Sequence, residues 1–327
     1  MPASFFLVIR KIMLKNPHIS DFKQDLTKAT AQRIAGQGGI TMNFTIVKNY
    51  RTTDTLRASF NKLTNETFVF DFNDWYNNGY WNDNYIPYSI IIDNEIIANV
   101  SVNIMNFNDN GIIRHFIQLG TVMTKPEYRN KGLIRTLMNE IEKDYPYVGG
   151  TFLFANDEVL EFYKKFGFTE ADEYQYSKNV TITNEASAVK APMNDKSDWD
   201  KVKASIDEST PNGAFELVGN SDLNMFYLAS FMKDSVYKVG DSIVVADKDG
   251  SELKIHGVFS KEPADLESVI NSFGSEVKTV KLCFTPKNTA GYTKILYKEE
   301  DCTLFVKGDA LMNFSSEGKM FPSLSHA

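Results

Sequence analysis

Cysteine and histidine are scarce in this sequence. Its 327 residues include 2 cysteines, Cys283 and Cys302, and 4 histidines, and none of these lies at the spacing of a zinc site. Two thiols cannot form the disulfide framework on which small secreted domains depend. We therefore expect reduced thiols and no structural metal.

Excess positive charge and long apolar runs are also lacking. The chain has 35 Lys and Arg against 42 Asp and Glu, which argues against nucleic acid as the main ligand because phosphate backbones require concentrated positive charge. The apolar segment 3–9 is too short to span a bilayer, and no basic residue precedes it. These absences favour a cytoplasmic protein that binds neither nucleic acid nor a membrane.

The length of the chain exceeds what a single hydrophobic core usually spans, so two domains are expected. A stretch rich in Asn, Ala, Ser and Lys separates them and is interpreted as a linker. Because a strand-like run follows Met42, one hypothesis is that translation starts there in the native protein. The predicted parts are an N-terminal extension at 1–41, a first domain at 42–183, the linker at 184–196 and a second domain at 197–327.

Periodicity predicts mixed secondary structure in both domains, and hence an α/β fold. In the first domain, helices are expected at 54–63, 132–145 and 157–166, and strands at 88–92, 95–104, 112–123, 150–154 and 173–180. In the second, helices are expected at 199–206, 223–233 and 262–273, and strands at 235–246, 252–259 and 279–284, with two more strands after them. The two domains thus share an element order, without a strong residue repeat.

The most informative motif lies where the strand at 112–123 gives way to the helix at 132–145. Arg129, Lys131 and Gly132 occupy this turn. The unpaired N–H groups and the positive dipole end of a helix start suit a pyrophosphate, and a glycine lets the backbone approach it closely. The segment resembles the acetyl-coenzyme A signature of the GNAT acyltransferase superfamily, Arg/Gln-x-x-Gly-x-Gly/Ala. Ile134 departs from it, because the family has Gly or Ala there.

A second motif combines Asn156 with Tyr163 in the run Phe-Tyr-x-x-x-Gly-Phe at 162–168. It again resembles the GNAT pattern. If 156–163 were helical, the seven-residue separation would place both side chains on one face. In the family the Asn contacts the pantetheine arm and the Tyr lies near the thioester sulfur. The resemblance implies that Tyr163 protonates the departing thiolate, a role that a phenol can fill; simple packing of Tyr163 is the alternative.

Taken together, the two motifs imply an N-acetyltransferase with the acyl-coenzyme A N-acyltransferase fold, in which an acceptor amine directly attacks bound acetyl-coenzyme A. The resemblance implies that backbone groups of 122–124 bind the pantetheine amides and polarise the thioester carbonyl. The residues expected to bind the cofactor are Val122, Met123, Thr124, Arg129, Asn130, Lys131, Gly132, Leu133, Ile134 and Asn156. No equivalent of either motif occurs in the second domain, which is interpreted as a degenerate GNAT-like domain.

The acceptor amine and its general base are less clearly marked. Aromatic rings and carboxylates are dense at 68–88, a combination that suits a cationic amine. Residues assigned to the acceptor are Trp75, Tyr76, Tyr80, Trp81 and His115, with Asp71, Asp74 and Asp83 as other candidate bases. The alternative is that these rings pin a loop to the core, and that His115 is an ordinary strand residue.

Several functional alternatives stay open at this point. The donor could carry a longer acyl group, or the protein could be a sensor that binds acyl-coenzyme A without catalysis. The acceptor could be a small molecule or a protein amine. The second domain could shape the acceptor cleft or hold a homo-oligomer together, and the apolar end of the chain, 320–327, is expected to tuck into a groove.

Overall fold

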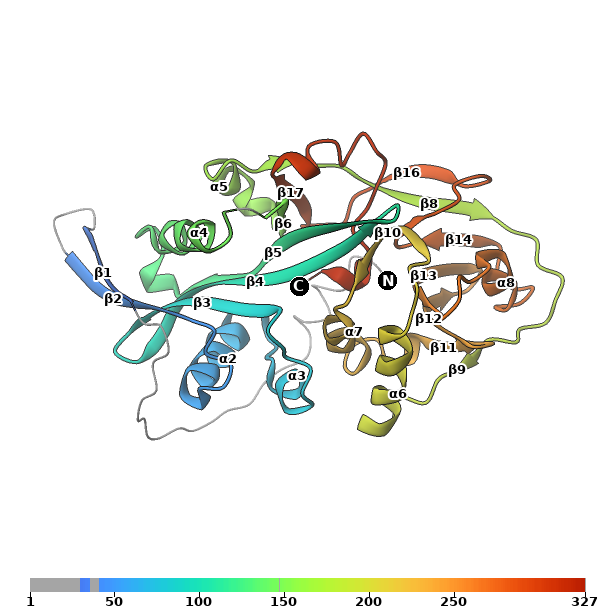
Figure 1. Cartoon of the computed structure of the whole chain (residues 1–327), viewed down its shortest axis with the longest axis horizontal. Helices are drawn as coiled ribbons and strands as arrows, with labels where there is room; N and C mark the ends of the chain where they lie inside the picture. The colour runs from blue at the N-terminus through green and yellow to red at the C-terminus, as the bar shows by residue number, and fades with distance from the viewer. Residues whose placement is uncertain (1–29, 36–40, 147, 327) are drawn as a thin grey trace. The chain divides into compact units, whose positions relative to one another are not determined.

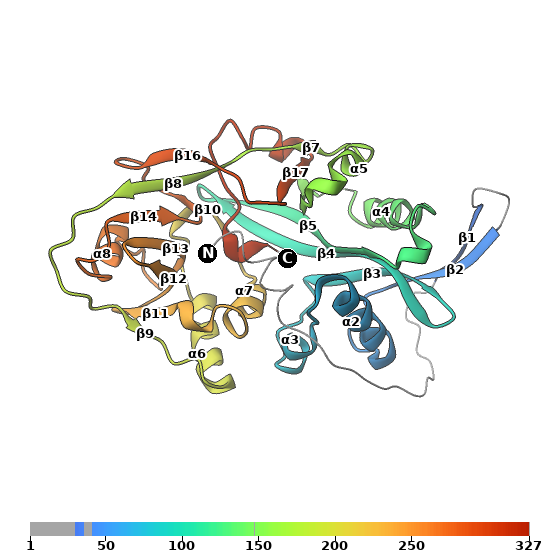
Figure 2. The same cartoon turned by 180° about the vertical axis from the view of Figure 1, so that it is seen from behind.

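The computed structural model describes residues 30–35, 41–146 and 148–326, which form two compact units (Figures 1 and 2). Unit 1 contains the described residues up to Ile104 and the segment Ile117–Val148, and unit 2 contains Met105–Phe116 and Gly149–His326. The chain therefore leaves unit 1 twice. Most of the predicted extension 1–41 lies outside the described residues.

Unit 1 is built on antiparallel strands that follow one another in chain order. The strands are β1 (Thr30–Ala35), β2 (Thr41–Lys48), β3 (Tyr85–Ile92), β4 (Glu95–Asp109) and β5 (Ile112–Thr124). Asp93 and Asn94, both with positive φ (48° and 65°), form the two-residue turn predicted between β3 and β4. The far ends of β4 and β5, with the turn that joins them, belong to unit 2.

The helices of unit 1 lie on both sides of these strands, with α2 and α3 on one side and α4 on the other (Figures 1 and 2). Their bounds are α2 (Asp54–Phe68), α3 (Asn73–Asn77), the 3-10 turn η1 (Pro126–Tyr128) and α4 (Leu133–Asp144). The amphipathic pattern of α4 is confirmed, because its buried residues are Leu133, Leu137, Met138 and Ile141.

In unit 2, a strand from the end of the chain pairs with strands that come much earlier in the sequence. β17 pairs antiparallel with both β6 and β7, and β10 pairs with β15 and with the end of β4. These strands are β6 (Gly150–Ala155), β7 (Thr169–Glu170), β10 (Gly213–Val218), β15 (Thr285–Pro286) and β17 (Thr303–Lys307). Strands from either side of the predicted linker at 184–196 are thus direct neighbours.

A seven-stranded sheet, ordered β16-β8-β14-β13-β12-β11-β9, forms the rest of unit 2. Its strands are β8 (Glu173–Asn179), β9 (Val189–Lys190), β11 (Val236–Val239), β12 (Ser242–Asp249), β13 (Glu252–Phe259), β14 (Thr279–Leu282) and β16 (Thr293–Tyr297). β13 and β14 are parallel. The single strand expected at 235–246 is wrong, because Gly240, with φ of 56°, turns the chain between β11 and β12. The mixed α/β fold class is confirmed, and a second sheet agrees with a tandem arrangement.

Helices and 3-10 turns lie between the strands of unit 2 and after its last strand. They are η2 (Asp157–Val159), α5 (Leu160–Lys164), α6 (Lys196–Asp207), α7 (Ser221–Leu228), η3 (Lys233–Ser235), α8 (Leu266–Asn271), η4 (Asp309–Leu311) and η5 (Ser323–Ser325). No helix in the described part of the chain is long and apolar enough to cross a membrane.

The C-terminal segment packs into unit 2, as expected from its apolar sequence. Phe321 is fully buried, and its ring stacks on Phe152 of β6 at 3.9 Å between centroids and on Phe314 at 4.6 Å. Asn224 of α7 donates a hydrogen bond to the carbonyl group of Leu324 at 3.1 Å. The described end of the chain is therefore part of the core rather than a loose tail.

Candidate functional site

The turn between β5 and α4 has the backbone geometry of an anion-binding site. Asn130 and Gly132 adopt left-handed conformations, with φ of 60° and 78°, and Gly132 is the N-cap of α4. No described side chain caps this end of the helix. The first N–H groups of α4 therefore remain available to a ligand, at the positive end of the helix dipole.

Space and charge at this turn also fit a pyrophosphate. A Cβ atom built on Gly132 would meet nothing within 4 Å, so a ligand can approach the backbone here. Arg129 and Lys131 are exposed; Arg129 Nε donates to the carbonyl group of Thr124 at 3.3 Å, which draws its guanidinium group back toward β5. The hydrogen-bond donors at this turn are backbone N–H groups and two cationic side chains, a combination that suits an anionic ligand.

The remaining predicted cofactor residues of unit 1 differ in exposure. Met123 and Leu133 are each 2% exposed and belong to the core, so only their backbone groups could meet a ligand. Val122, Thr124 and Ile134 are half-buried. Ile134, which departs from the family signature, is therefore partly withdrawn from solvent.

In unit 2, Asn156 follows the last residue of β6 and is exposed, with an extended backbone. Its Nδ2 atom lies 2.9 Å from Oδ2 of Asp301. The predicted helix at 157–166 is interrupted, because η2 precedes α5 and α5 begins only at Leu160. The inference that Asn156 and Tyr163 share one face of a continuous helix is therefore wrong, although the roles of the two residues do not depend on it.

Tyr163 lies on α5 in an aromatic environment of unit 2. Its side chain is 5% exposed, and its ring centroid lies 5.2 Å from that of Phe162 and 5.9 Å from that of Phe305 on β17. Burial raises the pKa of Tyr163 to about 12. The phenol is thus protonated at neutral pH, which is the state that a proton donor requires.

The aromatic residues assigned to the acceptor are mostly part of the core of unit 1. Trp75, Tyr80 and Trp81 are 7%, 2% and 3% exposed. The indoles of Trp75 and Trp81 stack at 5.9 Å. Tyr76 is half-buried, and the guanidinium group of Arg57 lies 3.7 Å from its ring centroid, where an amine would otherwise bind. These contacts favour the alternative that the rings pin the loop to the core.

The candidate bases are distributed over both units. His115 is exposed near the end of the β4–β5 hairpin in unit 2, and its Nδ1 atom lies 2.7 Å from Oδ1 of Asn106. Asp83 in unit 1 forms an ion pair with Arg51 at 3.0 Å. Asp71 accepts hydrogen bonds from the backbone and side chain of Asn73. These three groups already have protein partners. Asp74, the remaining candidate, is exposed in the first turn of α3, and none of the four is distinguished as a base by its surroundings.

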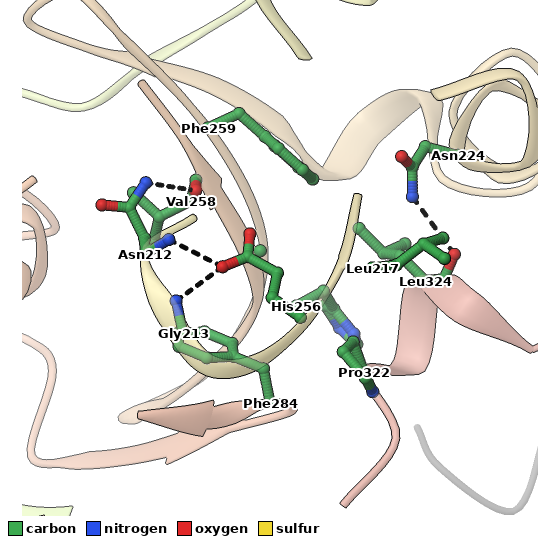
Figure 3. Close-up of a pocket in the computed structure, with 12 residues that line it drawn as sticks. Asn212, Gly213, Leu217, Asn224, His256, Val258, Phe259, Phe284, Pro322 and Leu324 are labelled. Atoms are coloured by element: carbon green, nitrogen blue, oxygen red, sulfur yellow. Dashed lines mark hydrogen bonds between the residues drawn. The ribbon is translucent and has the colours of Figure 1, made fainter. Parts of the chain in front are cut away.

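Unit 2 also contains a pocket that sequence reasoning did not find (Figure 3). The rings of Phe259 and Phe284 form part of its wall. The backbone N–H groups of Asn212 and Gly213 both donate to Oε2 of Glu216, at 2.7 and 2.5 Å. Burial raises the pKa of Glu216 to about 7, although the two N–H donors oppose the shift.

This shift predicts a pH-dependent effect of Glu216→Gln. A carboxyl group whose pKa is raised in the folded state binds more protons there than in the unfolded chain, so stability falls as pH rises from 4.5 to about 7. Gln cannot ionise. We therefore expect the free energy of unfolding of the Glu216→Gln variant, relative to that of the wild type, to be greater at pH 8 than at pH 5 by up to about 3 kcal/mol. Urea unfolding at the two pH values measures this difference.

The exposed Glu262 offers a control, because Glu262→Gln removes a carboxylate from the surface of the same unit. Its effect on the free energy of unfolding should be small at both pH values. An equal effect of Glu216→Gln at pH 5 and pH 8 would contradict the assignment of a buried, titrating carboxyl group.

Comparison with known proteins identifies the family of the first part of the chain. Residues 49–168 match the model of the Acetyltransferase (GNAT) family, so the expected GNAT domain is confirmed over this segment. The match includes the turn at Arg129–Gly132 and both residues of the second motif. None of the curated proteins matches the chain.

Solved structures show the same fold at low sequence identity. A conserved protein of unknown function from Enterococcus faecalis V583, described as a probable N-acyltransferase, is 12% identical, with 88% of this chain and 74% of that one covered and a TM-score of 0.53. A GCN5-related N-acetyltransferase from Kribbella flavida is 15% identical, with 82% and 71% covered and a TM-score of 0.50. These likenesses extend through most of the chain and support the acyltransferase fold.

Proposed function

We propose that this protein is an N-acetyltransferase that transfers the acetyl group of acetyl-coenzyme A to a primary amine by direct attack. The observation that carries the proposal is the turn before α4, where free N–H groups, two exposed cations and open space at Gly132 coincide. The GNAT match over 49–168 supports the same chemistry. The specific donor and acceptor are part of the proposal.

In this proposal, the start of α4 binds the negatively charged pyrophosphate group of the acyl donor. N–H groups of Leu133 and Ile134, with Arg129 and Lys131, bind the pyrophosphate, and the left-handed Gly132 keeps the approach open. Backbone groups of 122–124 bind the amides of the pantetheine arm, and one N–H group polarises the thioester carbonyl as negative charge develops on it.

Proton transfer completes the reaction. The neutral acceptor amine attacks the thioester carbonyl carbon, and the C–S bond breaks as the tetrahedral intermediate collapses. Tyr163, whose phenol is protonated at neutral pH, donates its proton to the departing thiolate. The base that receives the proton of the amine is not assigned: His115, Asp71 and Asp83 have protein partners, and Asp74 is an exposed residue of α3.

Two measurements test the proposal. Calorimetric titration of the purified protein with coenzyme A should give saturable binding, and a thiol-reactive dye should report coenzyme A release when acetyl-coenzyme A and a panel of primary amines are added. Longer acyl-coenzyme A donors in the same assay identify the preferred acyl group. Binding without thiol release for any amine would favour a sensor, and absence of binding would refute a cofactor site.

A further inference from the structure

A residue from the end of the chain lies directly against the proposed cofactor ligand Asn156. β17 pairs antiparallel with β6, and the last pair of the register joins Thr303 to Ala155. Beyond this pair the chains continue in opposite directions, so Asp301 comes to lie beside Asn156 and Asp157. All of these residues belong to unit 2.

The carboxylate of Asp301 accepts hydrogen bonds from two consecutive residues. Its Oδ2 atom lies 2.9 Å from Nδ2 of Asn156, and its Oδ1 atom lies 2.7 Å from the backbone nitrogen of Asp157. Thr303 donates to Oδ1 of Asp157 at 3.2 Å, which ties the same turn to β17. Both oxygens of Asp301 are therefore used to hold the start of η2.

These contacts determine which end of the Asn156 amide faces outward. A carboxylate can only accept, so the amide must present its NH₂ group to Asp301. Its carbonyl oxygen, Oδ1, is then the end left for a ligand, and the side chain is exposed. A carbonyl oxygen accepts from an N–H group, and the pantetheine arm of coenzyme A contains two amide N–H groups.

We propose that Asp301 is a positioning residue for the acyl donor: it orients the Asn156 amide so that Oδ1 accepts a hydrogen bond from an amide N–H of the pantetheine arm. The inference rests on the proposed function, in which Asn156 binds that arm. It gives a residue from the late part of the chain a role in binding the acyl donor. Asp301 acts through Asn156 and takes no part in the chemistry.

The Asp301→Asn variant tests this orientation of the Asn156 amide. Asparagine keeps the size of the side chain and tolerates the positive φ of 55° at this position. The carbonyl oxygen of the substituted side chain can still accept from Asp157, but its NH₂ group then faces Asn156. The amide of Asn156 must rotate to offer its own oxygen, which turns its NH₂ group outward. The outward acceptor is lost. The hydrogen bond between the two side chains is kept, and only the long contact of Asn156 Nδ2 with the backbone carbonyl of residue 301, at 3.5 Å, is given up.

Exchanging the two residues should restore the acceptor. In the double variant Asn156→Asp, Asp301→Asn, the NH₂ group at position 301 donates to one oxygen of the carboxylate at 156, and the other oxygen faces outward. The net charge of the pair equals that of the wild type. Glu300→Gln is the matched control, because it removes one negative charge from the adjacent exposed position of the same loop.

The experiment measures the Kd of coenzyme A by calorimetry and the KM and kcat for acetyl-coenzyme A in all four proteins. We expect about tenfold weaker binding and a matching rise in KM for Asp301→Asn, with kcat changed less than about twofold, since one hydrogen bond is lost. The double variant should return to within about threefold of the wild type, and Glu300→Gln should stay within about twofold. Circular dichroism confirms that each variant is folded.

Two results would overturn the inference. One is unchanged or tighter binding in a folded Asp301→Asn variant, as expected if Asp301 only repels the anionic donor. The other is a double variant that binds no better than Asp301→Asn. Failure of the wild type to bind coenzyme A is a separate outcome: it would refute the proposed function itself, and this inference with it.

Discussion

The Tyr163→Phe variant is expected to bind coenzyme A like the wild type and to lose about 10²- to 10⁴-fold in kcat. The substitution keeps the ring, which packs against Phe162 and Phe305, and removes only the hydroxyl group. Without that group, the thiolate must leave unprotonated or take its proton from water. Thiol release at saturating acetyl-coenzyme A and amine measures kcat, and calorimetry with coenzyme A measures binding.

Tyr237→Phe is a suitable control, because it removes a hydroxyl group from a half-buried tyrosine of β11 whose ring packs on Phe273 at 5.0 Å. Its kcat should equal that of the wild type. Full activity of Tyr163→Phe across the pH range would disprove the general-acid role and leave Tyr163 as a packing residue.

Coenzyme A binding should be lost in the double variant Arg129→Ala, Gly132→Trp. The first change removes a cation that would face the pyrophosphate, and the second fills the open space into which a Cβ at Gly132 would point. The left-handed φ of 78° at Gly132 also strains any other residue, by about 1 kcal/mol. Calorimetric titration at several protein concentrations measures the loss.

A control substitution for this loss of binding is available at Gly79. Its φ is 80°, and an added Cβ there also meets nothing within 4 Å, so Gly79→Trp imposes a similar strain elsewhere in unit 1. Combined with Lys143→Ala at the other end of α4, it forms a matched double control that should still bind coenzyme A. Tight binding by the Arg129→Ala, Gly132→Trp variant would mean that this turn is not the cofactor site.

Local patterns in the sequence predicted the helices and turns that are specified by residues close together in the chain. The helix α4 follows from the spacing of Leu133, Leu137 and Ile141, and the β3–β4 hairpin follows from Asp93-Asn94. Both signals lie within a few residues of the structure that they specify. The GNAT motif at the start of α4 is equally local, which is why it could be found without an alignment.

Sheet partners and side-chain environments could not be predicted in this way. Nothing near Thr303–Lys307 indicates that this strand pairs with β6, because the pairing depends on residues far away in the chain. The same limit concealed Asp301 as the partner of Asn156. Composition likewise could not distinguish rings that bind an amine from rings that pack, and the burial of Trp75 and Trp81 emerges only in the folded structure.

The pairing of β6 with β17 has a consequence for synthesis on the ribosome. Asn156 and Asp301 are 145 positions apart, so one edge of β6 has no partner strand until nearly the whole chain has been translated. At typical elongation rates this interval is on the order of ten seconds. An unpaired strand edge invites association with other chains during that time. The late synthesis of β17 thus leaves the nascent β6 edge open to association with other chains until the C-terminal part of the protein has been made.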